Sequence, residues 1–191
     1  MTFELIALSE IATVPWKNGA GLTRELAISP ADASVDDFDW RISVAAIERD
    51  APFSAFPGVD RCIVLLRGAG MRLRSVDGAI DRRLTQAYAP HRFSGDAALQ
   101  ASLIDGACED LNVMVRRGCC VADVATQSVS ADVAAADAGL LLCASGEWQV
   151  GDVALKTLHA LLCRSGLPRL QAHPLRAASA LIVVRLCQDH A

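Results

Sequence analysis

The stretch WRISVAAI, residues 40–47, alternates between two kinds of side chain. Trp40 and Ile42 fall on one face of an extended chain, whereas Arg41 and Ser43 fall on the other. A period of two is typical of a β-strand with one buried face and one polar face. The stretch therefore predicts a strand in a sheet that carries polar groups on one side.

Short apolar or alternating runs of this kind recur along the whole chain, separated by Gly, Pro and Asp. Asp77–Gly78 predicts the turn of a β-hairpin. Residues 31–37 and 128–139 could each form either a helical turn or a loop, and the sequence does not decide between them. Many short strands at nearly regular spacing predict an all-β sandwich or barrel. The expected strands are residues 3–8, 22–28, 40–47, 61–66, 71–76, 91–93, 98–104, 110–117, 120–126, 139–145, 154–163 and 180–187.

The length and composition bound the class of protein. A chain of 191 residues is one large domain or two small ones. No apolar run approaches the roughly 20 residues that a membrane helix needs. The N-terminal segment has no basic region ahead of an apolar one, so we expect no secretory signal and a cytoplasmic protein.

Charge and cysteine content exclude further classes. The net charge is −4 and the arginines are scattered, which disfavours a nucleic-acid-binding face. The seven cysteines have irregular spacing and form no CxxC motif. We therefore expect reduced, mostly buried thiols rather than a zinc ribbon or a redox site.

The stretch PWKNGAGLTREL, residues 15–26, gathers polar and ring side chains around a glycine-rich turn. Asn18–Gly19 favours positive φ, and such a turn exposes N–H groups that can hold an anion. The alternative is an ordinary polar hairpin. The spacing of the glycines fits neither a dinucleotide-binding motif nor a P-loop.

The stretch DWRISVAAIERDAPFSAFPGVDR, residues 39–61, carries two candidate binding arginines. Arg41 and Arg61 suit a ligand carboxylate, because a guanidinium binds both of its oxygens. The alternative is that these arginines form ion pairs with Asp39, Asp60 or Glu25, and on residue types alone it is favoured.

The stretch EDLNVMVRR, residues 109–117, places Asp110, Asn112 and Met114 on one strand face. Asparagine is depleted in strands, so its presence there favours a binding site. The face points either to solvent or into the mouth of a barrel.

No local motif for metal binding or nucleophilic catalysis is present. The four histidines are far apart and form no HxH or HExxH spacing. We expect no metal and no cofactor. His91 is a candidate base, but a strand-edge position explains it as well.

At these stretches the sequence resembles the HutD/Ves family. The resemblance rests on PWKNGAGLTREL, on DWRISVAAIERDAPFSAFPGVDR and on DLNVMVRRG, in that order across residues 3–118. Ala20 and Ala51 depart from the glycines that the family often carries there. The resemblance implies an RmlC-like cupin fold, a double-stranded β-helix, in one compact unit over residues 1–191. The resemblance leaves open whether residues 119–191 form a second barrel-like half.

The resemblance also implies a function. The family is associated with bacterial histidine utilisation, with formylglutamate or urocanate proposed as ligands. We expect a metal-free auxiliary or regulatory protein that binds a small anionic metabolite, with a homodimer left open. The alternative is a metal-independent isomerase or hydrolase that uses Glu25, Asp60, Asp110 or His91 for proton transfer. The candidate ligand-binding residues are Trp16, Lys17, Asn18, Gly19, Thr23, Glu25, Trp40, Arg41, Ser43, Phe53, Ser54, Phe56, Asp60, Arg61, Asp110 and Asn112.

Overall fold

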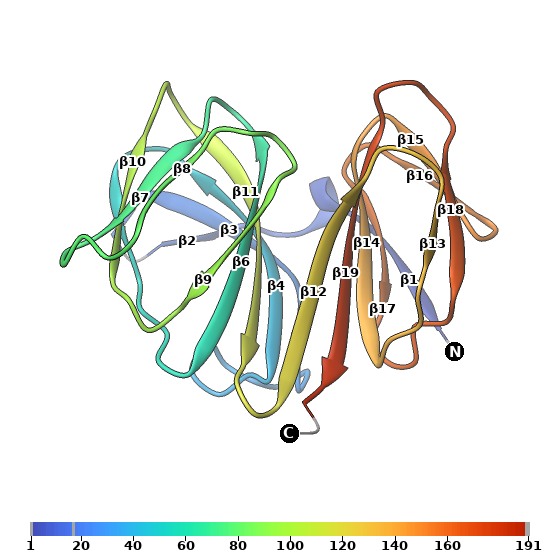
Figure 1. Cartoon of the computed structure of the whole chain (residues 1–191), viewed down its shortest axis with the longest axis horizontal. Coiled ribbons are helices and arrows are strands. Elements are labelled where there is room, and N and C mark those ends of the chain that lie inside the picture. The colour runs from blue at the N-terminus through green and yellow to red at the C-terminus, as the bar shows by residue number, and fades with distance from the viewer. Residues whose placement is uncertain (1, 17, 190–191) are drawn as a thin grey trace. The chain divides into compact units, whose positions relative to one another are not determined.

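A computed structural model describes residues 2–16 and 18–189, and its regular structure is almost entirely β (Figure 1). The contacts divide the chain into two compact units. One unit is Ala12–Cys119, and the other combines Met1–Ile11 with Cys120–Ala191. The second unit is therefore closed by the two ends of the chain.

The larger sheet of the unit Ala12–Cys119 has six antiparallel strands. The strand WRISVAAI is confirmed as a central strand, paired on both sides. In spatial order the strands are β2 (Val14–Pro15), β3 (Gly21–Ser29), β4 (Trp40–Ile47), β11 (Cys108–Arg116), β6 (Val59–Arg67) and β9 (Pro90–Ser94).

A four-stranded sheet packs against one face of this sheet. Its order is β5 (Ala51–Phe53), β10 (Leu99–Leu103), β7 (Met71–Ser75) and β8 (Asp81–Leu84). Inward residues of both sheets form one core, including Ile63 and Leu65 from the first and Met71 and Leu73 from the second. Burial of each such side chain contributes about 1.5–3 kcal/mol.

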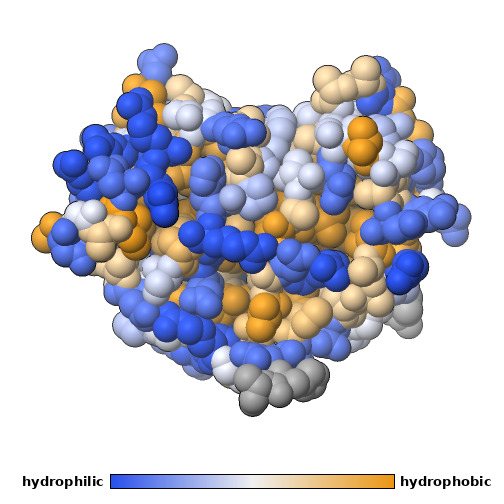
Figure 2. All heavy atoms as spheres, in the orientation of Figure 1, coloured by the Kyte–Doolittle hydropathy of each residue, from blue (hydrophilic) through white to orange (hydrophobic). Residues whose placement is uncertain are grey.

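The hairpin of β7 and β8 follows the predicted Asp77–Gly78 turn, with φ of 74° at Gly78. Its outward positions are charged, and Asp81 pairs with Arg72 and Arg74. Figure 2 shows hydrophilic side chains gathered over this hairpin, at the upper left of the view. Since β8 is an edge strand, these charges disfavour pairing with the edge of another sheet.

The other unit also consists of two facing antiparallel sheets. A short 3-10 helix, Leu8–Glu10, follows its first strand. The five-stranded sheet has the order β1 (Phe3–Ala7), β17 (His159–Cys163), β14 (Ala138–Ser145), β19 (Ala180–Gln188) and β12 (Cys120–Gln127). The four-stranded sheet has the order β13 (Ala131–Val133), β18 (Leu170–Pro174), β15 (Glu147–Val150) and β16 (Val153–Lys156).

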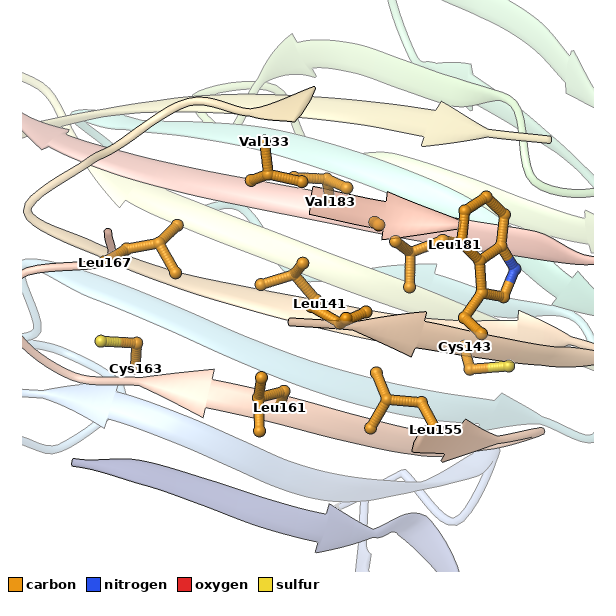
Figure 3. Packing of buried hydrophobic residues seen from close by; sticks show 12 residues of the cluster. Val133, Leu141, Cys143, Leu155, Leu161, Cys163, Leu167, Leu181 and Val183 are labelled. Carbon is orange, nitrogen blue, oxygen red and sulfur yellow. The ribbon is translucent and has the colours of Figure 1, made fainter. Parts of the chain in front are cut away.

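The core of this unit is aliphatic, with one tryptophan, Trp148, that is fully buried. Figure 3 shows Leu141, Leu155, Leu161 and Leu181 pointing toward one another from β14, β16, β17 and β19. Two cysteines lie in the same core, and the seven cysteines carry free thiols. The expectation of mostly buried, unpaired cysteines is confirmed, with Cys119 and Cys187 exposed.

The structure corrects one predicted strand. Residues 154–163 form two strands, because Leu158 adopts φ of 61° and turns the chain between β16 and β17. Residues 31–37 contain turns, and residues 128–139 contain the short strand β13, so neither holds a helical turn. No helix in the described part of the chain is long and apolar enough to cross a membrane.

Candidate functional site

A cavity of about 620 Å³ opens in the unit Ala12–Cys119. Its wall combines apolar residues with a few polar and charged ones, a composition typical of small-molecule sites. The lining residues are Val14, Pro15, Trp16, Asn18, Thr23, Glu25, Val35, Arg41, Ser43, Ala45, Pro52, Phe53, Ser54, Phe56, Arg61, Asn112 and Met114.

Strand register brings the polar groups of the wall together. Ser43 lies opposite Asn112 across the pairing of β4 with β11, and Arg41 lies opposite Met114. On the other side of β11, Arg61 of β6 is also opposite Met114. Because alternate residues share a face, these side chains form adjacent rows on the inner side of one sheet.

Arg61 is the most buried charged group of the wall, with 6% of its surface exposed. Its guanidinium carbon lies 5.1 Å, 5.5 Å and 5.2 Å from the ring centroids of Phe53, Phe56 and Phe93. Three rings around one guanidinium form a cation–π cage. We call Arg61 with these three phenylalanines the arginine cage.

The guanidinium in the arginine cage has few polar partners. Nη1 donates to the carbonyl oxygen of Ser54 at 3.3 Å, whereas Nε is buried without a hydrogen-bond partner. Burial lowers the pKa of Arg61 to about 10, against the opposing effect of Asp110. Among the described residues, Arg61 forms no ion pair. Burying a cation without an ion-pair partner raises the free energy of the folded protein. An anionic ligand bound to Arg61 would offset this cost.

Arg41 behaves differently. Its Nε donates to Glu25 Oε2 at 2.7 Å, and its side chain is 13% exposed. For both arginines, the alternative to ligand binding was a structural ion pair. That alternative is correct for Arg41, which pairs with Glu25. It does not hold for Arg61, because its neighbour Asp60 points to the opposite face and pairs with Arg117 at 3.0 Å.

Asp110 is fully buried on the same inward row of β11 as Asn112 and Met114. Neither of its carboxyl oxygens has a hydrogen-bond partner, and Asn112 Oδ1 also lacks one. Burial raises the pKa of Asp110 to about 7, although the charge of Arg61 acts in the opposite direction. This carboxyl therefore titrates near neutral pH.

The glycine-rich turn forms one wall of the cavity. Trp16 Nε1 donates to Thr23 Oγ1 at 2.7 Å, and the indole meets the ring of Phe53 edge-on at 6.0 Å. Gly19 adopts φ of 66°, as the Asn18–Gly19 signal predicts. The N–H of Gly19 donates to the Trp16 carbonyl, and that of Ala20 donates to Asn18 Oδ1. These two N–H groups are satisfied within the turn, which leaves neither for an anion.

Of the fifteen candidate residues that the structure describes, eleven line this cavity and four do not. Trp40 lies on the face of β4 opposite Arg41, Asp60 is exposed, and Asp110 is buried behind the lining. Gly19 faces Arg49, whose Nη2 donates to the Gly19 carbonyl oxygen at 2.6 Å. Lys17 lies outside the described residues. The cavity is thus lined by Trp16, Asn18, Thr23, Glu25, Arg41, Ser43, Phe53, Ser54, Phe56, Arg61 and Asn112.

Sequence reasoning missed several contributors. Phe93 completes the arginine cage because it is the register partner of Arg61 across β6 and β9. Val14 and Val35 are exposed apolar residues on the cavity wall, and no pattern marks them in the sequence. Met114 was visible as a neighbour on the Asn112 face, but a methionine there indicates packing as readily as a site.

The residues considered for proton transfer are not brought together. Glu25 is held by Arg41, Asp60 by Arg117, and Asp110 does not line the cavity. His91 lines a separate hollow of about 150 Å³, where its Nε2 is buried without a partner. Among residues 2–16 and 18–189, no group of three His, Cys, Asp or Glu side chains is placed to hold a metal ion.

Comparison with known proteins decides the family. The HutD family model matches residues 8–182. This chain belongs to the HutD/Ves family. One relative in that family, Protein Ves of Citrobacter koseri, is 39% identical over 138 residues, which cover 72% of this chain and 70% of that protein.

Solved structures agree on the architecture of this HutD/Ves member. The structure of HutD from Pseudomonas fluorescens SBW25, in a formate condition, matches with a TM-score of 0.86 at 26% identity. That match covers 98% of this chain and 100% of the other. A cupin 2 conserved barrel domain protein from Leptotrichia buccalis matches in fold alone, with a TM-score of 0.54 at 9% identity over 97% of this chain and 96% of the other. The predicted all-β RmlC-like cupin fold is confirmed.

Proposed function

We propose that this protein binds a small anionic metabolite in the cavity of the unit Ala12–Cys119, without a metal, as an auxiliary or regulatory factor in histidine utilisation. The observation that carries the proposal is the arginine cage: a buried guanidinium on the cavity wall without an ion-pair partner among the described residues. The volume of about 620 Å³ lies within the range of small-molecule sites.

A carboxylate fits the arginine cage for electrostatic reasons. Arg61 is buried beside three rings, so a charge-assisted hydrogen bond to its guanidinium would be stronger than on the surface. Ser43 and Asn112 add polar groups in the next row, which suit an amide or an imidazole on the same ligand. Formylglutamate and urocanate both combine such groups, which is why they are the first ligands to test.

Isothermal titration calorimetry against urocanate, formylglutamate, glutamate and histidine tests the proposal. We expect saturable binding of at least one of these acids, and a loss of about 30-fold or more in Arg61→Met, since truncating one partner of a buried charge pair costs about 2–5 kcal/mol. Arg83→Met, at an exposed position of β8, is the matched control and should bind as the parent does. Absence of heat with every acid, or equal affinity in Arg61→Met, would count against the proposal.

The alternative of a metal-independent isomerase or hydrolase predicts turnover. NMR of the same acids incubated with the protein would then show product. Binding without product supports the proposed auxiliary or regulatory role. We rank the enzyme second because no acid and base lie together on the cavity wall among the described residues.

A further inference from the structure

The cavity wall continues inward to Asp110, and the following inference rests on the proposed binding of an anion at Arg61. Asp110 has Ala45 of β4 and Leu65 of β6 as its register partners, and neither can bond to its carboxyl. The Asp110 side chain has no exposed surface, and neither of its carboxyl oxygens has a hydrogen-bond partner. Stabilisation of the fold therefore does not explain why a carboxyl group lies here. A leucine in its place would spare the fold the cost of burying an unpartnered carboxyl.

The charged and titratable groups around Asp110 come from few elements. β6 contributes Arg61, which favours the ionised carboxylate. β11 itself contributes Glu109, which disfavours it, and Cys108, whose own pKa Asp110 raises. The partner of Asp110 on β4 is the uncharged Ala45, and the arginine of that strand, Arg41, is paired with Glu25.

The opposite sheet and β9 add little charge to this environment. The core residues facing it from β5, β7 and β10 are apolar: Phe53, Met71, Leu73, Leu99 and Ala101. On β9, His91 is the register partner of Ile63, beyond β6. Arg61 is thus the cation whose charge opposes protonation of Asp110.

A ligand carboxylate on Arg61 would change this balance. It would neutralise the guanidinium that now stabilises ionised Asp110, and it would add a second negative charge close to the first. Two carboxylates that share one cation in a buried place do not both stay ionised, so one of them takes a proton. The ligand is held by the guanidinium directly, which leaves Asp110 as the group that becomes protonated.

We infer that Asp110, acting through Arg61, makes the cavity bind a carboxylate together with one proton. Asp110 is a positioning residue in this scheme, since it does not line the cavity and does not touch the ligand. In the free protein its ionised form opposes the charge of the arginine cage through space, without an ion pair. Binding exchanges that opposing charge for the ligand, and the proton that Asp110 takes up comes from the solvent.

Formate is a suitable probe, because it carries one carboxylate and no other group that titrates near neutral pH. Its dissociation constant is measured by ¹H–¹⁵N NMR titration of the protein from about pH 6 to about pH 8, below the range in which Arg61 loses its charge. We expect the affinity to fall by up to about tenfold for each pH unit in the upper part of this range, as one linked proton requires. A dissociation constant that does not change with pH would overturn the inference.

Three variants identify the group that takes up the proton. Asp110→Asn should bind formate with no dependence on pH in this range, where Arg61 keeps its charge, and near pH 8 more tightly than the parent. His91→Gln removes the histidine of β9, and Glu25→Gln removes the carboxylate on the cavity wall. Both should keep the slope of the parent. A slope that persists in Asp110→Asn, or disappears in His91→Gln, contradicts the inference.

Two further results separate the possible failures. If Asp110→Asn does not fold, ¹³C NMR of the Asp110 carboxyl in the parent gives the answer, and formate should raise its pKa. An unchanged pKa overturns the inference. Formate that binds the parent but not Arg61→Met, without a pH slope, refutes the proton coupling and supports the proposed function. If no NMR signal of the parent shifts with formate, both are wrong.

Discussion

Trp16 is fixed against the cavity by Thr23, whose Oγ1 accepts a 2.7 Å hydrogen bond from the indole Nε1. The bond joins β3 to the glycine-rich turn and holds the indole edge-on to Phe53. The orientation of the Trp16 indole therefore depends in part on one hydroxyl group.

Thr23→Val keeps the shape of the side chain and removes this acceptor. The indole N–H then loses its partner in a partly buried place, and we expect the free energy of unfolding to fall by about 1–3 kcal/mol. Urea denaturation measures the change. Thr85→Val, at an exposed position, is the control. Equal losses in the two variants would show that the hydrogen bond does not support the wall.

Phe56→Leu removes one ring of the arginine cage, where the centroid lies 5.5 Å from the Arg61 guanidinium carbon. The remaining rings hold the cation less firmly and admit water, so we expect the affinity for urocanate to fall by about 0.5–2 kcal/mol. Calorimetry gives the difference. Phe3→Leu, in the other unit, loses a ring away from the cavity and should leave the affinity unchanged. Unaltered binding in Phe56→Leu would contradict a role for the cage.

Asp110 makes the stability of the protein depend on pH. Its pKa in the folded state is about 7, above the ordinary value of 3.8, so the folded protein holds the proton more tightly than the unfolded chain. The free energy of unfolding therefore falls as the pH rises between these values, by about 1.4 kcal/mol per pH unit from this group.

Asp110→Asn removes this dependence. Chemical denaturation at several pH values should show that the stability of the variant relative to the parent increases from about pH 4 to about pH 7, with little further change above it. A difference that stays constant with pH would mean that the carboxyl is ionised throughout, at odds with its burial.

Leu141→Ala separates stability from binding. The side chain is fully buried in the core of the unit that contains the two chain ends, and no residue of that core lines the cavity. We expect a loss of about 2–5 kcal/mol in the free energy of unfolding. The affinity for urocanate, measured at a temperature where the variant is folded, should match the parent. A parallel loss of affinity would contradict the assignment of binding to the unit Ala12–Cys119.

The sequence predicted the long strands because alternation and apolar runs are strong signals over eight or nine residues, as in β4 and β6. It missed β2, β5, β13, β15 and β18, which have two to five residues each and show little periodicity. It also could not show that β1 pairs with β17, since that register joins residues far apart in the chain.

The candidate site followed from strand chemistry only in part. Arg41 and Ser43 were readable as one polar face, and Asn112 as an unusual strand residue. The arginine cage was readable only in part, because Phe53 and Phe56 lie in the candidate stretch that holds Arg61, whereas Phe93 reaches it from β9. The sequence also could not show that Asp110 lacks a hydrogen-bond partner, because this depends on which side chains pack around it in the folded protein.

The central claim is that Arg61 receives the acid group of a small ligand. A crystal structure of the protein with urocanate tests it most directly. The account predicts electron density in the cavity, with a carboxylate within hydrogen-bonding distance of the Arg61 guanidinium, between the rings of Phe53 and Phe56. A ligand bound elsewhere, or an empty cavity at a saturating concentration of urocanate, would contradict it.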